Sequence, residues 1–425
     1  MENIVIDRMT YGIDALGRLN GKVVFVPYAA PGDELSVEIT EEKTDYSRAK
    51  IVEILKPSKS RQKSNCPNFP ECGGCHWLHL YDEVQRREKD GYLTFLLKPL
   101  SPGDVYPIEP LSSEKYRNKM ELKIAKTADG KILLGNYKFH SHEVVSLKGC
   151  RVQLPQNMQM YDALVEFVNS TLMLPFANNI TEISLRTLGE QQHCLFLLKT
   201  QPPEEILNTF RDFFNSRATL SKLEVQSESE IFLTLMRDKP PFSFMNRTWT
   251  VSPNSFFQNN LEGAEAIFYT LQSIYESIPQ KGKFIDFYCG VGIQTMLLEK
   301  MFEEVVAVEA NENSYHDAIK NQKGRRPQQL RFLCRKAESI FNTPFTKGTI
   351  AALHVNPPRS GISQKVMRGL MGIRPKLITY LSCNPITFRR DAQGIIQLGY
   401  KLDQVYAFDL FPGTFHLEIL ASFSR

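Results

Sequence analysis

Apolar and polar residues alternate over much of residues 1–57, a pattern typical of short β-strands that are buried on one face. The segments KVVFVPYAAPGDELSVEI and SRAKIVEIL carry this alternation, and Asn20-Gly21 and Pro31-Gly32-Asp33 supply turn signals. Several short strands in so few residues predict a small, OB-like β-barrel over 1–57. Barrels of this kind serve either as nucleic-acid platforms or as structural caps, and the pattern leaves both open.

Residues 58–250 mix the two periodicities. The strand-like pieces MELKIAK, KILLGNY, HCLFLLK and IFLTLM lie among the helix-like pieces MYDALVEFVNSTL and PEEILNTFRDFF. We therefore expect an α/β middle domain, which begins with a cysteine-rich loop, CPNFPECGGC.

The pattern becomes regular from residue 251 onward. Apolar residues recur at helical spacing at Leu261, Ala264, Phe268, Leu271 and Tyr275. Strand-like runs then alternate with helices, in the order KFIDFYCG, EVVAVEA, RFLCRKA, AALHVNPP, KLITYLSCNP, YAFDLFP and LEILASFS. This alternation predicts a doubly wound, Rossmann-like α/β sheet over 251–425, with ligands at the carboxyl ends of its strands.

Length and charge narrow the picture in part. A chain of 425 residues is too long for one ordinary core and suggests two or three domains. No apolar run approaches the roughly 18 residues that span a bilayer, and MENIVIDRMTYG lacks the architecture of a signal peptide. We therefore expect a cytoplasmic protein with no membrane partner. The net charge is only +4, but residues 115–151 hold nine Lys/Arg and three Asp/Glu, a cluster that either neutralises phosphates or lies in solvated loops.

The eight cysteines of a chain expected in the cytoplasm are unlike a disulfide framework. Cys66, Cys72 and Cys75 have the spacing C-x5-C-x2-C, and Cys150 lies in a second loop, LKGC. Four thiolates in this pattern predict a metal site, either an iron–sulfur cluster or a four-thiolate zinc site, and the spacing favours the cluster modestly. Gly73-Gly74 lets the backbone wrap closely and offer amides to the sulfurs.

The segment DFYCGVG closes the first strand of the C-terminal sheet and precedes a helix. Its Gly290 and Gly292 let a cofactor approach the backbone, and Glu309, at the end of the next strand, is placed to bind ribose hydroxyls. This arrangement predicts a nucleoside cofactor. The loop lacks the third glycine of the dinucleotide pattern, which favours S-adenosylmethionine over a nicotinamide cofactor.

Two further strand ends carry candidate catalytic residues. Cys383 ends the fifth strand in YLSCNP, where a cysteine that faces the cofactor is a candidate nucleophile, and Glu418 follows FPGTFHL. A thiolate that adds to carbon 6 of uracil raises the electron density at carbon 5, and methylation there requires a base to remove the carbon-5 proton. Cys383 and Glu418 fit these two roles.

The strings DFYCGVG, NPPRSG, YLSCNP and FPGTFHLE resemble the motifs of the RNA uracil-C5 methyltransferase family, and SCNP together with F-P-x-T-x-H-x-E is highly specific. The resemblance covers nearly the whole chain and is weakest over 155–240. It implies an S-adenosylmethionine-dependent enzyme with Cys383 as nucleophile and Glu418 as proton acceptor. It also places four residues at cofactor-binding positions, namely Gln258, Tyr288, Glu309 and Asn356.

The same resemblance extends to the other domains. The N-terminal barrel is similar to the family's TRAM domain, and the four cysteines match its 4Fe-4S ligands. Family members with both features mostly act on 23S ribosomal RNA, which is therefore the favoured RNA partner, with transfer RNA as the alternative. We expect a monomer without an obligate protein partner.

Three positions depart from the family pattern. Asn356 stands where the family usually has Asp, so that an acceptor oxygen is kept but the charge is lost. Gly413 replaces the family's His, and Ile293 occupies a position that is more often polar. We expect the first two changes either to tune substrate choice or to weaken activity.

Two other functions are left open by the residues alone. An oxidoreductase with a nicotinamide cofactor and an iron–sulfur cluster fits the glycine loop but has no use for SCNP or the Cys–Glu pair. A non-catalytic RNA-binding protein that keeps the fold is the other alternative.

Trp77 either packs in the core or stacks on a base. The other cysteines are expected in the core, namely Cys194, Cys289 and Cys334.

Overall fold

The computed structural model describes residues 1–108, 110–279, 281–323 and 329–425. The N-terminal strands form a closed barrel in the order β1-β2-β3-β5-β4. Its core is small and aliphatic, because the inward positions of the alternating pattern are occupied by residues such as Ile4, Val24, Val26 and Leu35. The predicted OB-like barrel is confirmed. Its strands are β1 (Glu2–Met9), β2 (Asp14–Leu19), β3 (Lys22–Pro27), β4 (Glu34–Glu42) and β5 (Tyr46–Lys56).

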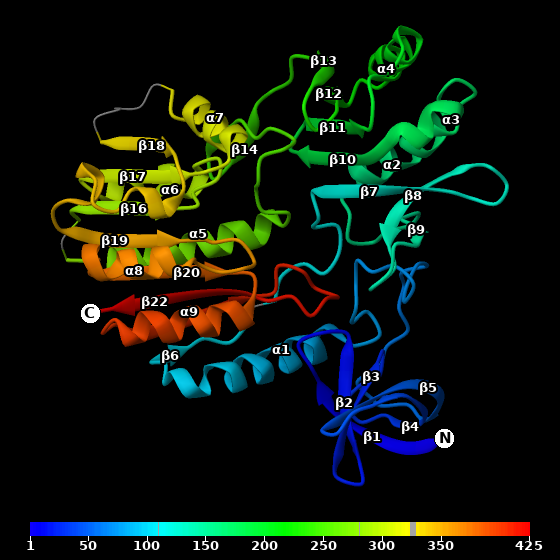
Figure 1. Cartoon of the computed structure of the whole chain (residues 1–425), viewed down its shortest axis with the longest axis horizontal. Helices are drawn as coiled ribbons and strands as arrows, with labels where there is room; N and C mark the ends of the chain where they lie inside the picture. The colour runs from blue at the N-terminus through cyan, green and yellow to red at the C-terminus, as the bar shows by residue number, and fades with distance from the viewer. Residues whose placement is uncertain (109, 280, 324–328) are drawn as a thin grey trace.

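The middle of the chain forms a second sheet in the order β13-β12-β11-β10-β7-β8-β9, with α2, α3 and α4 packed against it (Figure 1). The strands are β7 (Lys119–Lys126), β8 (Ile132–Tyr137), β9 (Val144–Ser146), β10 (Ile180–Leu188), β11 (Gln191–Leu198), β12 (Leu220–Gln226) and β13 (Ile231–Met236). The helices are α2 (Pro155–Val168), α3 (Met173–Phe176) and α4 (Glu204–Ser216). A hairpin of β14 (Phe242–Phe244) and β15 (Arg247–Trp249) leads into the C-terminal part.

The C-terminal sheet has the order β18-β17-β16-β19-β20-β22-β21-β6, and among its described strands only β22 runs antiparallel to its neighbours. The strands are β6 (Asp104–Val105), β16 (Lys283–Phe287), β17 (Glu304–Glu309), β18 (Leu330–Cys334), β19 (Ile350–Val355), β20 (Leu377–Ser382), β21 (Lys401–Phe408) and β22 (Glu418–Ser424). The strands β16, β19 and β20 are almost wholly buried, because helices cover both faces. The predicted Rossmann-like sheet is confirmed.

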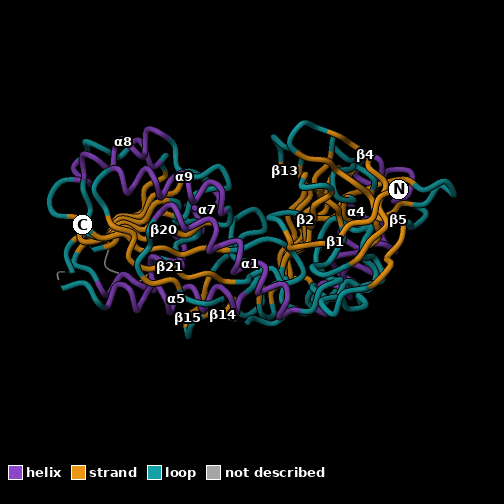
Figure 2. Tube along the Cα trace, turned by 90° about the horizontal axis from the view of Figure 1, so that it is seen from below, coloured by secondary structure: helices purple, strands orange, loops and turns teal. Residues whose placement is uncertain are grey.

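Two layers of helices enclose this sheet, and Figure 2 shows α8 and α9 on the side opposite α5. One face carries α5 (Leu261–Glu276), α6 (Ile293–Leu298) and α7 (Glu312–Asn321). The other carries α1 (Asp82–Leu97), α8 (Gln364–Ile373) and α9 (Pro385–Gln397). Within the described residues, no helix is long and apolar enough to cross a membrane.

Helix α1 and strand β6 precede the middle sheet in sequence but pack on the C-terminal sheet. Leu93, Leu96 and Leu97 of α1 belong to the same core as α8 and α9, and β6 extends the sheet edge beside β21. The domain boundaries at 57 and 250 therefore stay predictions. The carboxyl ends of the parallel strands face the barrel and the middle domain (Figure 1), so all three parts of the chain can reach one site.

Candidate active site

The glycine loop after β16 is tied to the end of β17. The Gly290 amide donates to Glu309 Oε2 (2.9 Å), and the Asn311 amide donates to Glu309 Oε1 (2.7 Å). Gly290, Gly292 and Tyr288 have positive φ angles of 57°, 76° and 63°. At Gly292 a Cβ atom would lie 2.7 Å from the Phe332 ring, so glycine is required there both for its backbone conformation and for space.

A narrow cavity of about 50 Å³ lies beside this loop. Four of the six residues predicted to bind the cofactor line it, namely Gln258, Tyr288, Gly290 and Asn356. Glu309 contacts the loop through Gly290, and Gly292 caps the following helix α6. The Ile293 side chain also lines the cavity, together with Phe256 and Phe257. The structure thus gathers the predicted cofactor residues around a largely apolar slot, from the carboxyl ends of β16, β17 and β19 and from the segment before α5.

Cys383 lies between β20 and α9. The next residue, Asn384, caps the helix by accepting from the Ile386 amide (3.0 Å) and donates to the Arg359 carbonyl (3.1 Å). Burial raises the pKa of the Cys383 thiol and the nearby Glu418 raises it further, whereas Arg359 lowers it by its charge and by a hydrogen bond. The Arg359 guanidinium therefore stabilises the thiolate form, which is the nucleophilic form of cysteine.

Glu418 begins β22 and is 4% exposed. Burial raises its pKa from 4.5 to about 8, and the charge of Arg359 acts in the opposite direction. Glu418 raises the pKa of the Cys383 thiol, and both residues raise the pKa of Tyr11. Arg359 lowers the pKa of both Cys383 and Glu418, so the structure brings the predicted pair together near Arg359. Their separation along the chain gives no hint of this; the strand order, with β20 next to β22, places them at one edge.

Arg359 belongs to the NPPRSG motif, and sequence reasoning assigns it no role. Its backbone carbonyl also accepts from the Thr387 hydroxyl (3.1 Å). The rest of the loop is fixed by the buried Asp391, which accepts from the Ile362 amide (2.9 Å) and the Tyr380 hydroxyl (2.6 Å). A loop fixed by hydrogen bonds therefore holds a positive charge that acts on both the candidate nucleophile and the candidate base.

The segment 409–417, which precedes Glu418, contains no helix or strand and is held by other parts of the chain. The buried Lys89 ammonium of α1 lies 2.6 Å from Asp409. The Gly413 amide donates to Gln85 Oε1 (2.8 Å), and the Gly413 carbonyl accepts from the amides of His76 and Trp77 (2.8 Å each). Helix α1 and the residues that follow the cysteine-rich loop therefore determine where this segment lies.

These contacts explain why the family's histidine is absent at position 413. Gly413 has φ of 83°, and a Cβ atom there would lie 2.6 Å from Leu78 Cδ2. A side chain there would collide with Leu78, which follows the cysteine-rich loop. The neighbouring His416 is neutral, since burial lowers its pKa to about 3, which agrees with a positioning role rather than a role as base.

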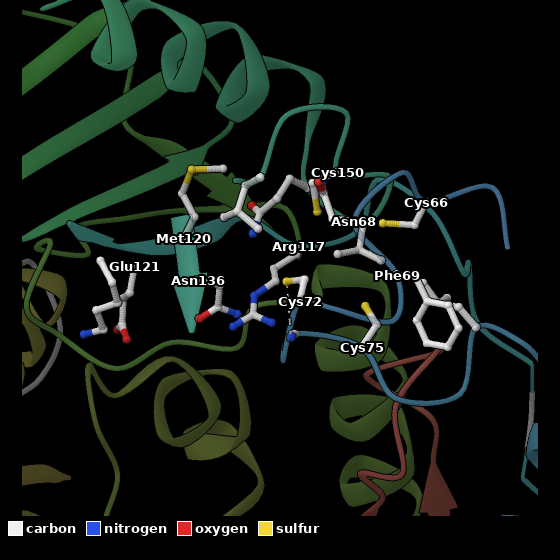
Figure 3. A pocket seen from close by; sticks show the side chains of 16 residues that line it. Cys66, Asn68, Phe69, Cys72, Cys75, Arg117, Met120, Glu121, Asn136 and Cys150 are labelled. Atoms are coloured by element: carbon white, nitrogen blue, oxygen red, sulfur yellow. Dashed lines mark hydrogen bonds between the residues drawn. The ribbon is translucent and has the colours of Figure 1, made fainter. Parts of the chain in front are cut away.

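The four cysteines of the predicted metal site line one cavity of about 110 Å³ (Figure 3). Burial raises the pKa of the Cys75 thiol, and Cys150, Cys72 and Cys66 raise it further in that order, so all four thiols lie within electrostatic reach of one another. Arg117 lines the same cavity. The Gly74 amide donates to Cys72 Sγ (3.4 Å), as its place in the loop predicts. Among the described residues, no three His, Cys, Asp or Glu side chains are grouped closely enough to hold a single metal ion.

The remaining aromatic and cysteine predictions have mixed outcomes. Trp77 is 2% exposed and its Nε1 donates to the Gly12 carbonyl (2.9 Å), so it packs in the core. Cys194 is buried as expected, and Cys289 is half-buried beside the cofactor cavity. The expectation for Cys334 is wrong, because this residue lies exposed at the carboxyl end of β18.

Comparisons with known proteins agree with this arrangement. Residues 244–424 match the family model described as tRNA (Uracil-5-)-methyltransferase, and residues 4–52 match the TRAM domain. An uncharacterized RNA methyltransferase of Synechocystis sp. is 28% identical, with 98% of this chain and 94% of that protein aligned. A second one, of Caldanaerobacter subterraneus, is 27% identical over 99% of this chain and 97% of its own length.

Among solved structures, the Pyrococcus abyssi tRNA (uracil-54, C5)-methyltransferase in complex with S-adenosyl-L-homocysteine is similar over nearly its whole length. The TM-score is 0.74 and the identity 22%, with 99% of this chain and 100% of that chain covered. At this identity the likeness concerns the fold. It extends over the barrel, the middle sheet and the C-terminal sheet together.

Proposed function

Since the chain belongs to the RNA uracil-C5 methyltransferase family, we propose that it methylates carbon 5 of a uridine in RNA with S-adenosylmethionine as methyl donor. The observation that carries the proposal is the grouping of Cys383, Glu418 and Arg359 at the end of β20. This strand lies beside β19, which Asn356 of the cofactor cavity follows. A nicotinamide-dependent oxidoreductase has no use for such a group.

Cys383 starts the reaction by adding to carbon 6 of the uracil ring. The sulfur–carbon bond forms as the carbon 5–carbon 6 double bond opens, and the electron pair moves toward carbon 5 and oxygen 4. Arg359 favours this step twice, because it stabilises the thiolate and because a guanidinium can donate to the oxygen that gains charge. Carbon 5 thereby becomes the nucleophile that accepts the methyl group.

Glu418 completes the reaction as a general base. Once carbon 5 carries the methyl group, its proton passes to the Glu418 carboxylate, the ring double bond re-forms and the bond to the Cys383 sulfur breaks. A carboxyl with a pKa of about 8 is a stronger base than an ordinary glutamate and is well suited to work near neutral pH. Its removal of the proton should become faster as the pH rises toward 8.

The cavity beside the glycine loop fits S-adenosylmethionine. When bound, this molecule supplies an electrophilic methyl group on a sulfonium. Gly290 leaves room for its close approach, and Glu309 lies where ribose hydroxyls are bound in sheets of this class. Phe256 and Phe257 offer apolar surface to an adenine ring. Asn356 contributes an uncharged side chain, so its contact with the cofactor is a hydrogen bond rather than an ion pair.

We also propose that Cys66, Cys72, Cys75 and Cys150 hold one 4Fe-4S cluster. Such a cluster is bound by four thiolates that surround it, and the four thiols here surround a cavity instead of converging on one point (Figure 3). The positive charge of Arg117 suits an anionic cluster. Anaerobically purified protein should be brown and carry about four irons per chain, as a cubane requires. Colourless protein with one zinc per chain would instead indicate a structural zinc site and contradict the cluster.

The proposed RNA is 23S ribosomal RNA, in keeping with the combination of TRAM barrel and four cysteines, and transfer RNA is the alternative that the name of the matching family model favours. Mapping of 5-methyluridine in both RNAs, in a strain with and without this gene, decides between them. The target is the RNA position whose methylation is lost when the gene is deleted. That methylation should return when the wild-type gene is restored, but not when the Cys383→Ala gene is restored.

A trapping experiment tests the chemistry directly. RNA that contains 5-fluorouridine should form a denaturation-resistant adduct with the enzyme in the presence of S-adenosylmethionine, because fluorine cannot leave as a cation. Cys383→Ala should form no adduct. Glu418→Gln should accumulate a methylated adduct on ordinary RNA, because addition and methyl transfer remain possible while proton removal fails. Rapid turnover by that variant would rule out Glu418 as the base.

A further inference from the structure

The turn between β1 and β2 of the barrel reaches the candidate active site. The Gly12 carbonyl accepts from Trp77 Nε1 (2.9 Å), and the Met9 amide donates to Glu88 Oε2 of α1 (3.0 Å). The Tyr11 ring stacks on Tyr92 of α1, with centroids 5.0 Å apart, and meets the edge of Phe415 at 5.2 Å. Phe415 belongs to the segment that leads to Glu418, so Tyr11 lies beside the catalytic group.

The charges around the Tyr11 hydroxyl give a second measure of this proximity. Burial raises its pKa and the Cys383 thiol raises it further, whereas Arg359 lowers it. The hydroxyl therefore stays protonated at neutral pH and can donate a hydrogen bond. No motif in the sequence indicates that a barrel residue contributes to the catalytic site.

A cavity of about 420 Å³ continues outward from Tyr11 between the barrel and α1, which begins beside the barrel (Figure 1). Its volume falls within the range of about 300–1,000 Å³ of sites that bind small ligands. Its lining combines aromatic rings and cations, with Tyr11, Tyr92 and Phe95 facing Arg8 and Arg87; the remaining lining residues include one acid, Glu88.

Phe95 is the most telling residue of this lining. It is 58% exposed on α1, and the Arg8 guanidinium lies over its ring, 5.9 Å from the centroid. Arg389 of α9 is close enough to lower the pKa of Tyr92. Exposed aromatic rings interleaved with arginines are the surface on which single-stranded nucleic acids stack their bases and neutralise their phosphates. Tyr11, which lines the cavity, links this surface to the candidate catalytic residues.

We propose that this cavity between the β1–β2 turn and α1 is a subsite for a nucleotide next to the target uridine, with Phe95 and Tyr92 stacking on its base and Arg8 near its phosphate. Tyr11 then forms the wall between the flanking base and the uracil ring. The barrel thus reads the nucleotide beside the modified position. This inference rests on the proposed function, because the occupant is the RNA that carries the uridine.

The test uses the full-length protein and the 5-fluorouridine RNA fragment, from 23S ribosomal RNA or from transfer RNA, that forms the Cys383 adduct. Phe95→Ala removes an exposed side chain and should leave the fold intact. It should raise the RNA concentration for half-maximal adduct formation about tenfold, as the loss of one base stack does, with the maximal rate unchanged. Tyr269→Ala, which removes an aromatic ring that is 55% exposed on α5, is the matched control and should have no effect.

A modified RNA identifies the base that stacks. In one RNA the 5′ neighbour of the 5-fluorouridine is replaced by an abasic residue, and in another the 3′ neighbour. At one of these two positions the replacement should lower the affinity of the wild type about tenfold. At the same position it should lower the affinity of Phe95→Ala little or not at all, because the stacking side chain is already missing. Equal abasic penalties in both proteins at both positions, or a Phe95→Ala affinity like that of Tyr269→Ala, would overturn the subsite. If wild-type protein forms an adduct with neither RNA, the proposed function fails first, and the subsite with it.

Discussion

Replacement of Glu418 by Gln should make the folded protein more stable at alkaline pH while it abolishes turnover. The carboxyl is 4% exposed, and its pKa rises from 4.5 to about 8 because burial disfavours the charged form. Since the folded-state pKa lies above the unfolded value, the folded state binds the proton more tightly. The native state therefore loses stability as the pH rises from 4.5 to 8, and the loss is complete above pH 8.

The size of the effect follows from the two pKa values. The interval between 4.5 and about 8 corresponds to about 5 kcal/mol at alkaline pH. At pH 6 only about 2 kcal/mol of this has been lost, so the wild type should lose about 3 kcal/mol more by pH 9 through this group. The buried amide that Glu418→Gln introduces costs about 1–3 kcal/mol if it lacks a partner, but that cost does not change with pH.

Urea unfolding at pH 6 and pH 9 measures this difference. The two buried tryptophans, Trp77 and Trp249, provide the fluorescence signal. The stability of Glu418→Gln relative to wild type should increase by about 3 kcal/mol between the two pH values, whereas the same substitution at the exposed Glu303 should shift nothing. If the unfolding free energies of wild type and Glu418→Gln change with pH in the same way, the claim that Glu418 is a buried carboxyl with a raised pKa is refuted.

Other variants probe the supports of the site. Lys89→Met should cost about 3–5 kcal/mol of unfolding free energy, because Asp409 is left buried without its cation; Lys89→Met with Asp409→Leu should recover much of this in the same urea titration. Gly413→Ala should lower kcat with little change in S-adenosylmethionine affinity measured by calorimetry, because its Cβ would meet Leu78 at 2.6 Å. Cys150→Ser should lose most of the bound iron by elemental analysis and also leave that affinity nearly unchanged. If Cys150→Ser loses S-adenosylmethionine affinity together with the iron, the cysteine cavity and the cofactor loop are coupled, and the expectation that they act independently is wrong.

The sequence is sufficient for those parts of the site that lie at strand ends. Gly290, Glu309 and Cys383 lie at or just after the ends of strands whose periodicity is clear, and parallel strands present their carboxyl ends at one edge. The neighbouring position of Glu418 follows from β22 inserting next to β20, which a list of strands does not reveal. The family motif supplies that information instead.

Contacts between domains could not be predicted, because side-chain periodicity reports which face of an element is buried but not against what. Lys89 lies in the polar run DEVQRREKD, a pattern typical of a solvent-exposed helix, yet it is buried against Asp409. Tyr11 occupies a barrel turn, where aromatic residues carry no specific signal, and it reaches Phe415. Cys334 shows the opposite error: it is exposed because it is the last residue of β18, at the outer edge of the sheet.

The burial of Glu418 also explains why so many distant segments contact residues 409–417. A buried carboxyl with a raised pKa makes a strong base but weakens the folded state. This segment has no helix or strand, and its internal backbone hydrogen bonds include only a short turn from the Thr414 amide to the Phe411 carbonyl. Lys89, Gln85 and the His76-Trp77 amides supply the missing interactions from outside. The proposed catalysis at Glu418 therefore depends on α1 and on the residues that follow the cysteine-rich loop. Among the described residues, none that lines the cofactor cavity belongs to either segment.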